Sequence, residues 1–202
     1  MGDTLSGMML GEFLRGLGSR TPTPGGGAAA GVAGALGASV ARMVVEFSIG
    51  KKSLAAHEGR LLEARGVLDD LAARFVRLGD EDAEAYGVLN AMQRLPEEDP
   101  GRAGLAAALE RCVRVPGDMV RSAVELAGVV ESLVGRSARG LRSDLAIAAV
   151  LSEATASAGA WNVGINLAGM EDEAARARIE AETARALEAV RSARARVEEA
   201  CR

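Results

Sequence analysis

One long apolar stripe constrains the fold of this chain more than any other feature. Its residues follow alternating steps of three and four: Leu54, His57, Leu61, Ala64, Leu68, Leu71, Phe75 and Leu78. This spacing places one side of a helix against other helices. If the helix continues through Gly79, the same steps lead on to Asp82, Ala85, Leu89 and Met92. We therefore expect a long packing helix that carries a carboxylate in its apolar stripe.

A run of small residues between Ala28 and Val45 predicts a second kind of helix. It should begin within the glycines at 25–27 and end near Phe47. Small residues one turn apart let a neighbouring backbone approach closely, so this helix belongs at the centre of a bundle. Because the run contains Arg42 and its summed hydrophobicity is low, we expect no association with a membrane.

Prolines and polar loops divide the remainder of the chain into further helices. A short helix leads to Cys112, and Pro116 suits the first turn of the next one. Ser143 could cap a helix that carries Trp161 into the core, and a charged helix follows Gly169. Aromatic residues make up only 2% of the chain, which disfavours strands. We expect an all-α fold, a single-domain bundle of about six or seven helices over residues 1–202.

The composition argues against several classes of function. A net charge of -4 and a pI near 5.2 disfavour a nucleic-acid partner, which needs a clustered basic surface. With one histidine and two cysteines at no metal-ligand spacing, we expect no metal site. His57 lies in the apolar stripe and is expected to be packed rather than catalytic. The first residues lack the basic and apolar regions of a signal peptide, so we expect a cytoplasmic protein.

Both ends of the small-residue helix carry candidate ligand contacts. Gly25, Gly26 and Gly27 expose backbone N–H groups at a helix start, where the field is partly positive and a ligand can approach closely. The alternative is that these glycines only permit a turn and close packing. A dinucleotide fingerprint is excluded, because the segment before the glycines contains two prolines and cannot be a central strand. At the other end, Lys51 and Lys52 either complement the helix dipole or bind an anionic ligand.

Asp82 is a candidate for acid–base chemistry. A carboxylate in an apolar stripe is unfavourable unless it is paired, or its pKa is raised so that it acts as an acid or base. Three structural alternatives stay open: a helix break at Gly79, a role as the cap of a new helix, or an ion pair with an arginine. Capping and dipole effects explain Asp144 at a helix start. Asn162 and Asn166 either cap carbonyls or hold a ligand.

Three separated blocks cover most of the chain: TPTPGGGAAAGVAGALGASVARMVVEFSIGKKS, DEDAEAYGVLNAMQRLP and SDLAIAAVLSEATASAGAWNVGINL. Together they resemble the cyclodeaminase/cyclohydrolase family, found at the C-terminus of formiminotransferase-cyclodeaminase and as free-standing methenyltetrahydrofolate cyclohydrolase. Members read close to T-P-G-G-G-S-A-A-A and T-I-G-K-K in the first block, and end the third with N-V-x-I-N-L. The resemblance independently implies an all-helical fold.

The same resemblance implies an enzyme of tetrahydrofolate one-carbon metabolism, a hydrolase or a lyase. Family members hydrolyse 5,10-methenyltetrahydrofolate reversibly to the 10-formyl form, or cyclise the 5-formimino form with release of ammonia. Both reactions pass through a tetrahedral carbon between two nitrogens and need a group that moves protons. The resemblance implies a folate substrate, no cofactor and a homodimer.

Matched position by position, the family assigns acid–base or catalytic roles to Asp144, Asp82 and Lys51. It assigns substrate binding to Gly25, Gly26, Gly27, Lys52, Ser143 and Asn166. Departures from the family pattern leave the choice between the two reactions open: Ala28 replaces a serine, Glu46 a neutral residue and Leu54 a tyrosine, and the loop at 135–144 is longer and more basic. The alternative is a non-catalytic folate-binding or scaffold protein whose pocket has drifted.

Overall fold

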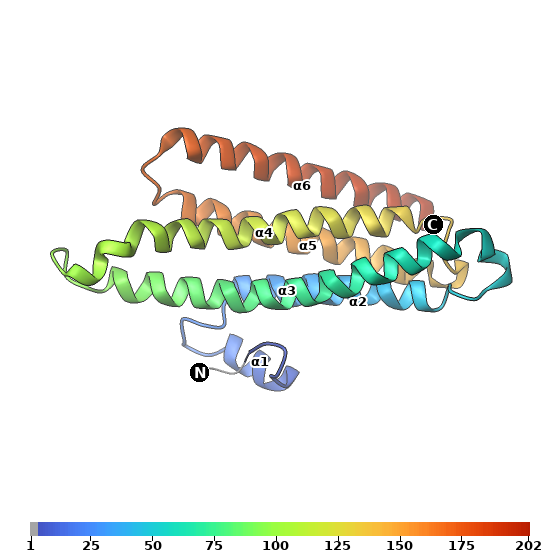
Figure 1. Cartoon of the computed structure of the whole chain (residues 1–202), viewed down its shortest axis with the longest axis horizontal. Helices are drawn as coiled ribbons and strands as arrows, with labels where there is room; N and C mark the ends of the chain where they lie inside the picture. The colour runs from blue at the N-terminus through green and yellow to red at the C-terminus, as the bar shows by residue number, and fades with distance from the viewer. Residues whose placement is uncertain (1–3) are drawn as a thin grey trace.

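Six α-helices make up the part of the chain that the computed structural model describes, residues 4–202 (Figure 1). They are α1 (Leu10–Leu17), α2 (Gly26–Glu46), α3 (Glu58–Gln93), α4 (Leu105–Ser132), α5 (Arg142–Leu167) and α6 (Glu173–Cys201). Short 3₁₀ helices precede three of them: η1 (Lys52–His57), η2 (Pro100–Gly104) and η3 (Arg139–Leu141). The predicted all-α, single-domain bundle is confirmed.

The four helices α2 to α5 form a closed bundle. Each packs against the next, and α5 packs back on α2. The last helix, α6, lies along α4 and α5, and Figure 1 shows it diverging from α4 toward its N-terminal end. The first helix, α1, lies outside the bundle beside α2 and α3 (Figure 1).

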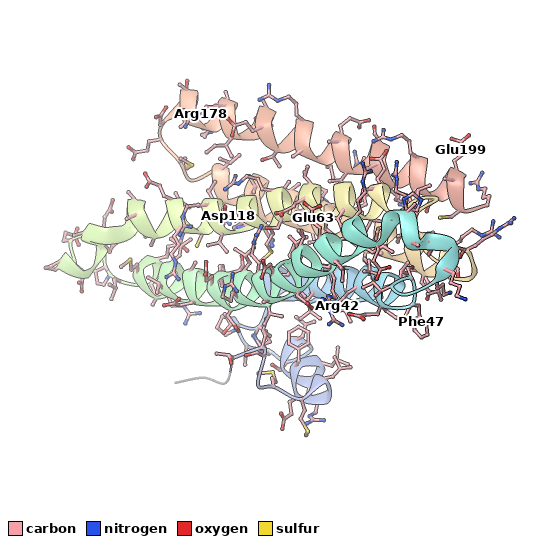
Figure 2. The ribbon with its side chains drawn as sticks, turned by 45° about the vertical axis from the view of Figure 1, so that its right-hand side comes forward. Arg42, Phe47, Glu63, Asp118, Arg178 and Glu199 are labelled. Carbon is pink, nitrogen blue, oxygen red and sulfur yellow. The ribbon has the colours of Figure 1, made fainter. Side chains whose placement is uncertain are left out.

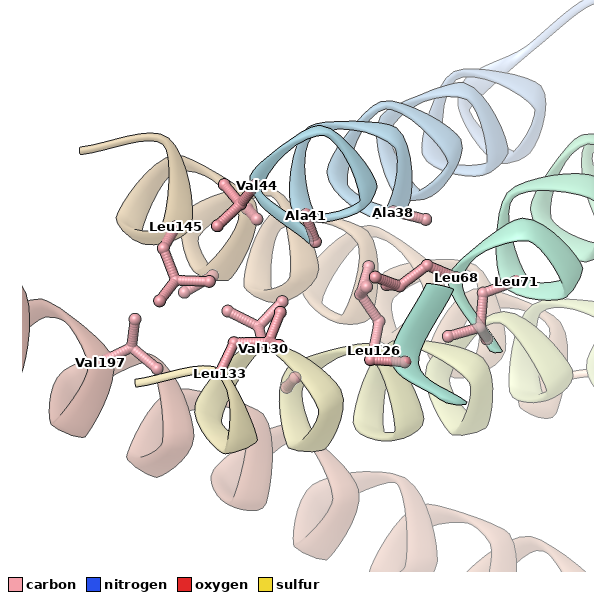
Figure 3. Packing of buried hydrophobic residues seen from close by; sticks show 14 of the residues in the cluster. Ala38, Ala41, Val44, Leu68, Leu71, Leu126, Val130, Leu133, Leu145 and Val197 are labelled. Carbon is pink, nitrogen blue, oxygen red and sulfur yellow. The ribbon is translucent and has the colours of Figure 1, made fainter. Parts of the chain in front are cut away.

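The core forms where the predicted apolar stripe of α3 meets the other long helices. Figure 3 shows Ala38 and Val44 of α2 close to side chains from the other long helices. Fully buried members of this cluster include Leu61, Leu68, Leu71, Phe75, Leu126, Val130, Val190 and Val197. The predicted stripe of α3 is therefore the core-facing side of a continuous helix.

Glycines set the distance between α2 and α3. A Cβ added to Gly31 would lie 2.6 Å from the carbonyl oxygen of Phe75 and 3.0 Å from the Cα of Gly79. The backbones thus touch where side chains would hold them apart, as the small-residue spacing predicts.

Among the described helices α2 is long and apolar enough to cross a membrane by length and composition alone. Half of its apolar window is buried in the bundle, as in a core helix.

Pro116 lies inside α4, so the prediction of two helices around it is wrong. A proline usually breaks a helix because it lacks the N–H that bonds to the carbonyl four residues earlier. Here that carbonyl belongs to Cys112, and it accepts a hydrogen bond from Nδ2 of Asn166 on α5 at 2.7 Å. A contact between helices thus satisfies the acceptor that the proline leaves free.

Three smaller predictions are also wrong. Trp161 is 81% exposed on the outer side of α5 rather than buried in the core. The stripe predicted a helix from Leu54, but α3 begins at Glu58 with His57 as its N-cap, because the residues before it form a 3₁₀ helix. Ser143 is the second residue of α5, which Leu141 precedes as the N-cap, so the Ser143 hydroxyl does not cap the helix.

Candidate functional site

A cavity of about 280 Å³ lies at the N-terminal end of α2. Its walls come from four helices: the glycines of α2, Asp82 and Tyr86 of α3, Cys112 of α4, and the C-terminal turns of α5. Figure 1 shows that α2 begins short of the ends of α3 and α4 along the bundle axis, and the cavity lies beyond the first turn of α2. The chain before α2 closes one side with Pro22 and Thr23.

Asp82 provides the ionisable group of this cavity. Its helix runs without a break through Gly79 to Gln93, so Asp82 neither follows a helix break nor caps a new helix. Within residues 4–202 its carboxylate has no hydrogen bond or ion pair. Burial raises the pKa of Asp82 above its usual 3.8. None of the three structural alternatives for this residue matches the structure.

The glycines of α2 make room for that carboxylate. Gly27 is buried directly against Asp82, and a Cβ added to Gly27 would overlap the carboxylate atoms. Gly25 is the N-cap, in an extended conformation, and Gly26 is the first helical residue. The first N–H groups of a helix have no partner within it, so they are available to a ligand in the cavity.

Asn166 forms the opposite wall and is held in place by α4. Its Nδ2 donates to the Cys112 carbonyl that Pro116 leaves free, which leaves the carboxamide oxygen available to a ligand. Asn162, one turn earlier, also lines the cavity. The interpretation that an amide caps a carbonyl is thus confirmed for Asn166, which bonds a carbonyl of another helix. Asn166 also lines the cavity, where its oxygen could hold a ligand.

Tyr86, Cys112 and Ile165 line the cavity but were not predicted from the sequence. Tyr86 follows Asp82 by one helical turn, and that spacing on a continuous helix could have indicated it. Burial first, and then the neighbouring Asp82, raise the pKa of the Cys112 thiol, so it stays neutral at physiological pH. No pattern in the sequence pointed to Cys112, because α4 and α3 meet there only in the folded bundle.

The remaining predicted residues lie at the other end of α2, about 30 Å away for a helix of 21 residues. Lys51 lines a second cavity of about 580 Å³ with Arg139 and Arg142. Ser143 lines a neighbouring cavity of about 530 Å³. Asp144 is in the first turn of α5, consistent with the dipole interpretation. Within residues 4–202 the side chain of Lys51 makes no hydrogen bond or ion pair.

Lys52, at the start of η1, lies at this end too. The folded chain thus brings together the glycines, Asp82 and Asn166. It keeps Lys51, Lys52, Ser143 and Asp144 apart from them. No group of three or more His, Cys, Asp or Glu side chains that could hold a metal ion occurs among the described residues.

The half-buried carboxyl of Asp82, which has no partner within residues 4–202, lies beside free helix N–H groups and an amide. Such a group can move a proton within a bound ligand and favour positive charge on it. The profile of the Formiminotransferase-cyclodeaminase family matches residues 9–185, most of the chain. The chain belongs to this family. All the residues that line the small cavity fall within the matched range.

Individual members of the Formiminotransferase-cyclodeaminase family resemble the chain over most of its length. A methenyltetrahydrofolate cyclohydrolase from Methylorubrum extorquens is 32% identical over 80% of this chain and 80% of its own. The crystal structure of formiminotetrahydrofolate cyclodeaminase from Thermotoga maritima has a TM-score of 0.89 at 28% identity, covering 96% of this chain and 95% of that one. The formimidoyltransferase-cyclodeaminase of Gallus gallus is 28% identical, and the chain spans 31% of its length.

Proposed function

We propose that this protein is an enzyme of tetrahydrofolate one-carbon metabolism. Its reaction is the hydrolysis of 5,10-methenyltetrahydrofolate to 10-formyltetrahydrofolate, or the cyclisation of 5-formiminotetrahydrofolate with release of ammonia. Relatives of both activities support the proposal, and the cyclohydrolase is similar in length to this chain. The observation that carries it is the position of Asp82, half-buried in a cavity against Gly27 with no partner among residues 4–202.

Asp82 suits the hydrolysis because it can carry both proton transfers. The carbon of the methenyl bridge lies between two nitrogens and shares their positive charge, which a nearby carboxylate stabilises. As water adds to this carbon, the Asp82 carboxylate accepts a proton from it. The resulting carboxylic acid then returns the proton to N5 as the bond between carbon and N5 breaks. The hydroxyl on the carbon loses its own proton to solvent and becomes the formyl oxygen, so the positive charge of the methenyl form leaves as a released proton. A pKa raised by burial brings this acid–base pair closer to neutral pH.

The cyclisation can use the same group. N10 of the substrate adds to the carbon of the protonated formimino group, whose nitrogen becomes a neutral amino group, and N10 loses its proton to Asp82. The carbon is again tetrahedral, now between N5, N10 and the amino nitrogen. Asp82 then protonates that amino nitrogen, and ammonia leaves. The two reactions differ in which group enters and which leaves, so one arrangement of residues serves either.

The proposal assigns substrate binding to the α2 glycines and to Asn166, whose carboxamide oxygen is available in the cavity. Roles for Lys51, Lys52, Ser143 and Asp144 stay predictions, because these residues lie at the far end of the bundle within one protomer. We further propose that residues 1–202 form one domain of a cytoplasmic homodimer that needs no cofactor.

The test is the loss of absorbance of 5,10-methenyltetrahydrofolate with purified protein. Asp82→Asn should lower the rate by at least 100-fold, the lower range for loss of a general acid–base group. Asp70→Asn is the matched control, because Asp70 is an exposed carboxylate on the same helix. Release of ammonia from 5-formiminotetrahydrofolate tests the second reaction with the same variants.

A rate equal to that of the Asp70→Asn control would remove Asp82 from the chemistry. Tight binding of reduced folates without turnover of either substrate would instead favour the non-catalytic binding or scaffold protein.

A further inference from the structure

Pro116 is buried inside α4, where a proline is unfavourable. It lacks an N–H, so the carbonyl of Cys112 has no partner within the helix. The missing donor comes from α5, where Nδ2 of Asn166 lies 2.7 Å from the Cys112 oxygen. Within residues 4–202 this is the only hydrogen bond that joins α4 to α5. The proline is thus the reason that this carbonyl is open to a side chain of another helix.

The packing of α5 on α4 brings Asn166 to this carbonyl. Gly159, Val163 and Asn166 follow steps of four and three, so they lie on one side of α5. A Cβ added to Gly159 would lie 3.1 Å from the carbonyl oxygen of Pro116, so the two helices touch two turns before Asn166. Val163 is fully buried and packs with Val113 of α4. These contacts fix the place of the Asn166 backbone beside α4.

The neighbouring carboxylates are not alternative partners for the amide. Asp118, two residues after the proline and labelled in Figure 2, pairs with Arg114 and Arg121 of its own helix. Asp82, which lines the same cavity as Asn166, accepts no hydrogen bond within residues 4–202. The amide therefore donates to the carbonyl rather than to either carboxylate.

This hydrogen bond decides which end of the Asn166 amide is available to a ligand. A carbonyl oxygen only accepts, so the amide nitrogen must face Cys112. The amide is planar and its oxygen lies on the other side of Cγ, so the oxygen is turned away from the Cys112 carbonyl. Rotation of the amide by 180° would set two carbonyl oxygens against each other and leave both without a donor. The wall of the cavity formed by Asn166 thus offers a hydrogen-bond acceptor.

We propose that Pro116 is a positioning residue for this site. By leaving the Cys112 carbonyl free, it holds Asn166 with its oxygen available to the ligand, so that this wall of the cavity recognises an N–H group. The inference rests on the proposed function for its substrate, a reduced folate, whose pterin ring carries several N–H groups. With any other residue at position 116, the helix N–H would bond the Cys112 carbonyl. The amide could then adopt either orientation, and its donors would compete with its oxygen for the ligand.

The orientation of Asn166 can be measured by NMR without any activity. The chain has only four side-chain amides, in Asn90, Gln93, Asn162 and Asn166. The spectrum therefore contains four NH₂ pairs, and Asn166→Ala identifies its pair by the loss of those signals. In the wild type one proton of this pair should exchange slowly with solvent, because it is bonded to the Cys112 carbonyl. In Pro116→Ala it should exchange about fivefold faster or more, as expected for loss of one hydrogen bond.

Binding of tetrahydrofolate tests the consequence for the ligand. Pro116→Ala should raise the Kd about 2–10-fold. A free choice between two orientations halves the competent population, which gives the lower value, and complete loss of one hydrogen bond to the ligand gives about the upper one. Because Asn166 is assigned to binding and not to proton transfer, KM should rise by a similar factor and kcat should stay close to that of the wild type.

Gly117→Ala is the matched control. It also strengthens the turn of α4 that contains the proline, but it adds no N–H. Its Cβ would approach a guanidinium nitrogen of Arg121 only to 3.6 Å, an ordinary contact. This variant should leave both the exchange rate of the Asn166 amide and the Kd unchanged.

A double variant separates positioning of the amide from a change in the shape of α4. In an Asn166→Ala background, Pro116→Ala should leave the Kd unchanged, because no amide is left to orient. An equal rise in Kd in both backgrounds would mean that Pro116 acts only through the shape of its helix, and the inference would be overturned.

Two NMR results would also overturn the inference. One is an unchanged exchange rate of the Asn166 amide in Pro116→Ala. The other is a loss of its protection in the wild type when tetrahydrofolate binds, because the amide would then turn its donors to the ligand. If the wild type neither binds nor turns over a folate, the proposed function fails, and the exchange rates alone decide whether Pro116 holds Asn166.

Discussion

Replacement of Gly27 by alanine tests whether the Asp82 carboxylate must keep its position. Gly27 is the second residue of α2 and is buried. A Cβ built there would overlap the carboxylate, and even its most distant atom, Oδ1, would lie only 2.6 Å away. Ordinary contact requires about 3.5 Å, so the carboxylate must move by about 1 Å or more.

Expressed as free energies, the loss of kcat/KM in Gly27→Ala should exceed the loss of folding stability. Misplacement of a catalytic group by about 1 Å costs on the order of 100-fold in rate, which corresponds to about 2.7 kcal/mol of transition-state stabilisation. Overpacking costs about 1–3 kcal/mol of folding free energy, and the helix preference of alanine over glycine returns about 0.5–1 kcal/mol. The net loss of up to about 2.5 kcal/mol lowers Tm by no more than about 10 °C for a domain of this size.

The assay compares kcat/KM for methenyltetrahydrofolate with Tm from circular dichroism. Gly66→Ala is the control, because Gly66 lies on the helix of Asp82 and its added Cβ would meet nothing within 4 Å. It should keep full activity and an equal or higher Tm. Gly27→Ala should lower activity no further in an Asp82→Asn background. Wild-type activity of a folded Gly27→Ala variant would refute the requirement for this carboxylate position.

Three further predictions concern stability. Gly31→Ala should cost about 1–3 kcal/mol, because its Cβ meets rigid backbone of α3; an unchanged denaturation midpoint would contradict this. Asn166→Ala should cost about 1–3 kcal/mol by leaving the Cys112 carbonyl without its donor. In a Pro116→Ala background, the new N–H bonds to that carbonyl and the cost should shrink in urea unfolding. Because burial raises the pKa of Asp82, ionisation of this residue destabilises the fold at neutral pH. Asp82→Asn should therefore raise Tm at pH 7, and this gain should disappear as the pH falls toward 3.8 and below.

The candidate site could be predicted from the sequence only in part. Periodicity placed Asp82 in an apolar stripe, and its chemistry followed from the cost of burying a carboxylate. The position of Pro116 was misjudged because its effect depends on Asn166, a donor on another helix that is 50 residues away in the chain. Trp161 was misjudged because α5 is apolar on nearly every side, so its sequence does not indicate which side faces solvent.

The amino-acid sequence by itself determined the helices, the stripe of α3 and the close contact of α2 with α3, because these follow from local spacing and side-chain size. Only the tertiary structure decided which candidate residues share a site. It joins Gly27, Asp82 and Asn166, and separates them from Lys51 by the length of α2. The physical reason is that residue spacing fixes the direction of a side chain within its own helix, whereas its neighbours depend on how the helices pack.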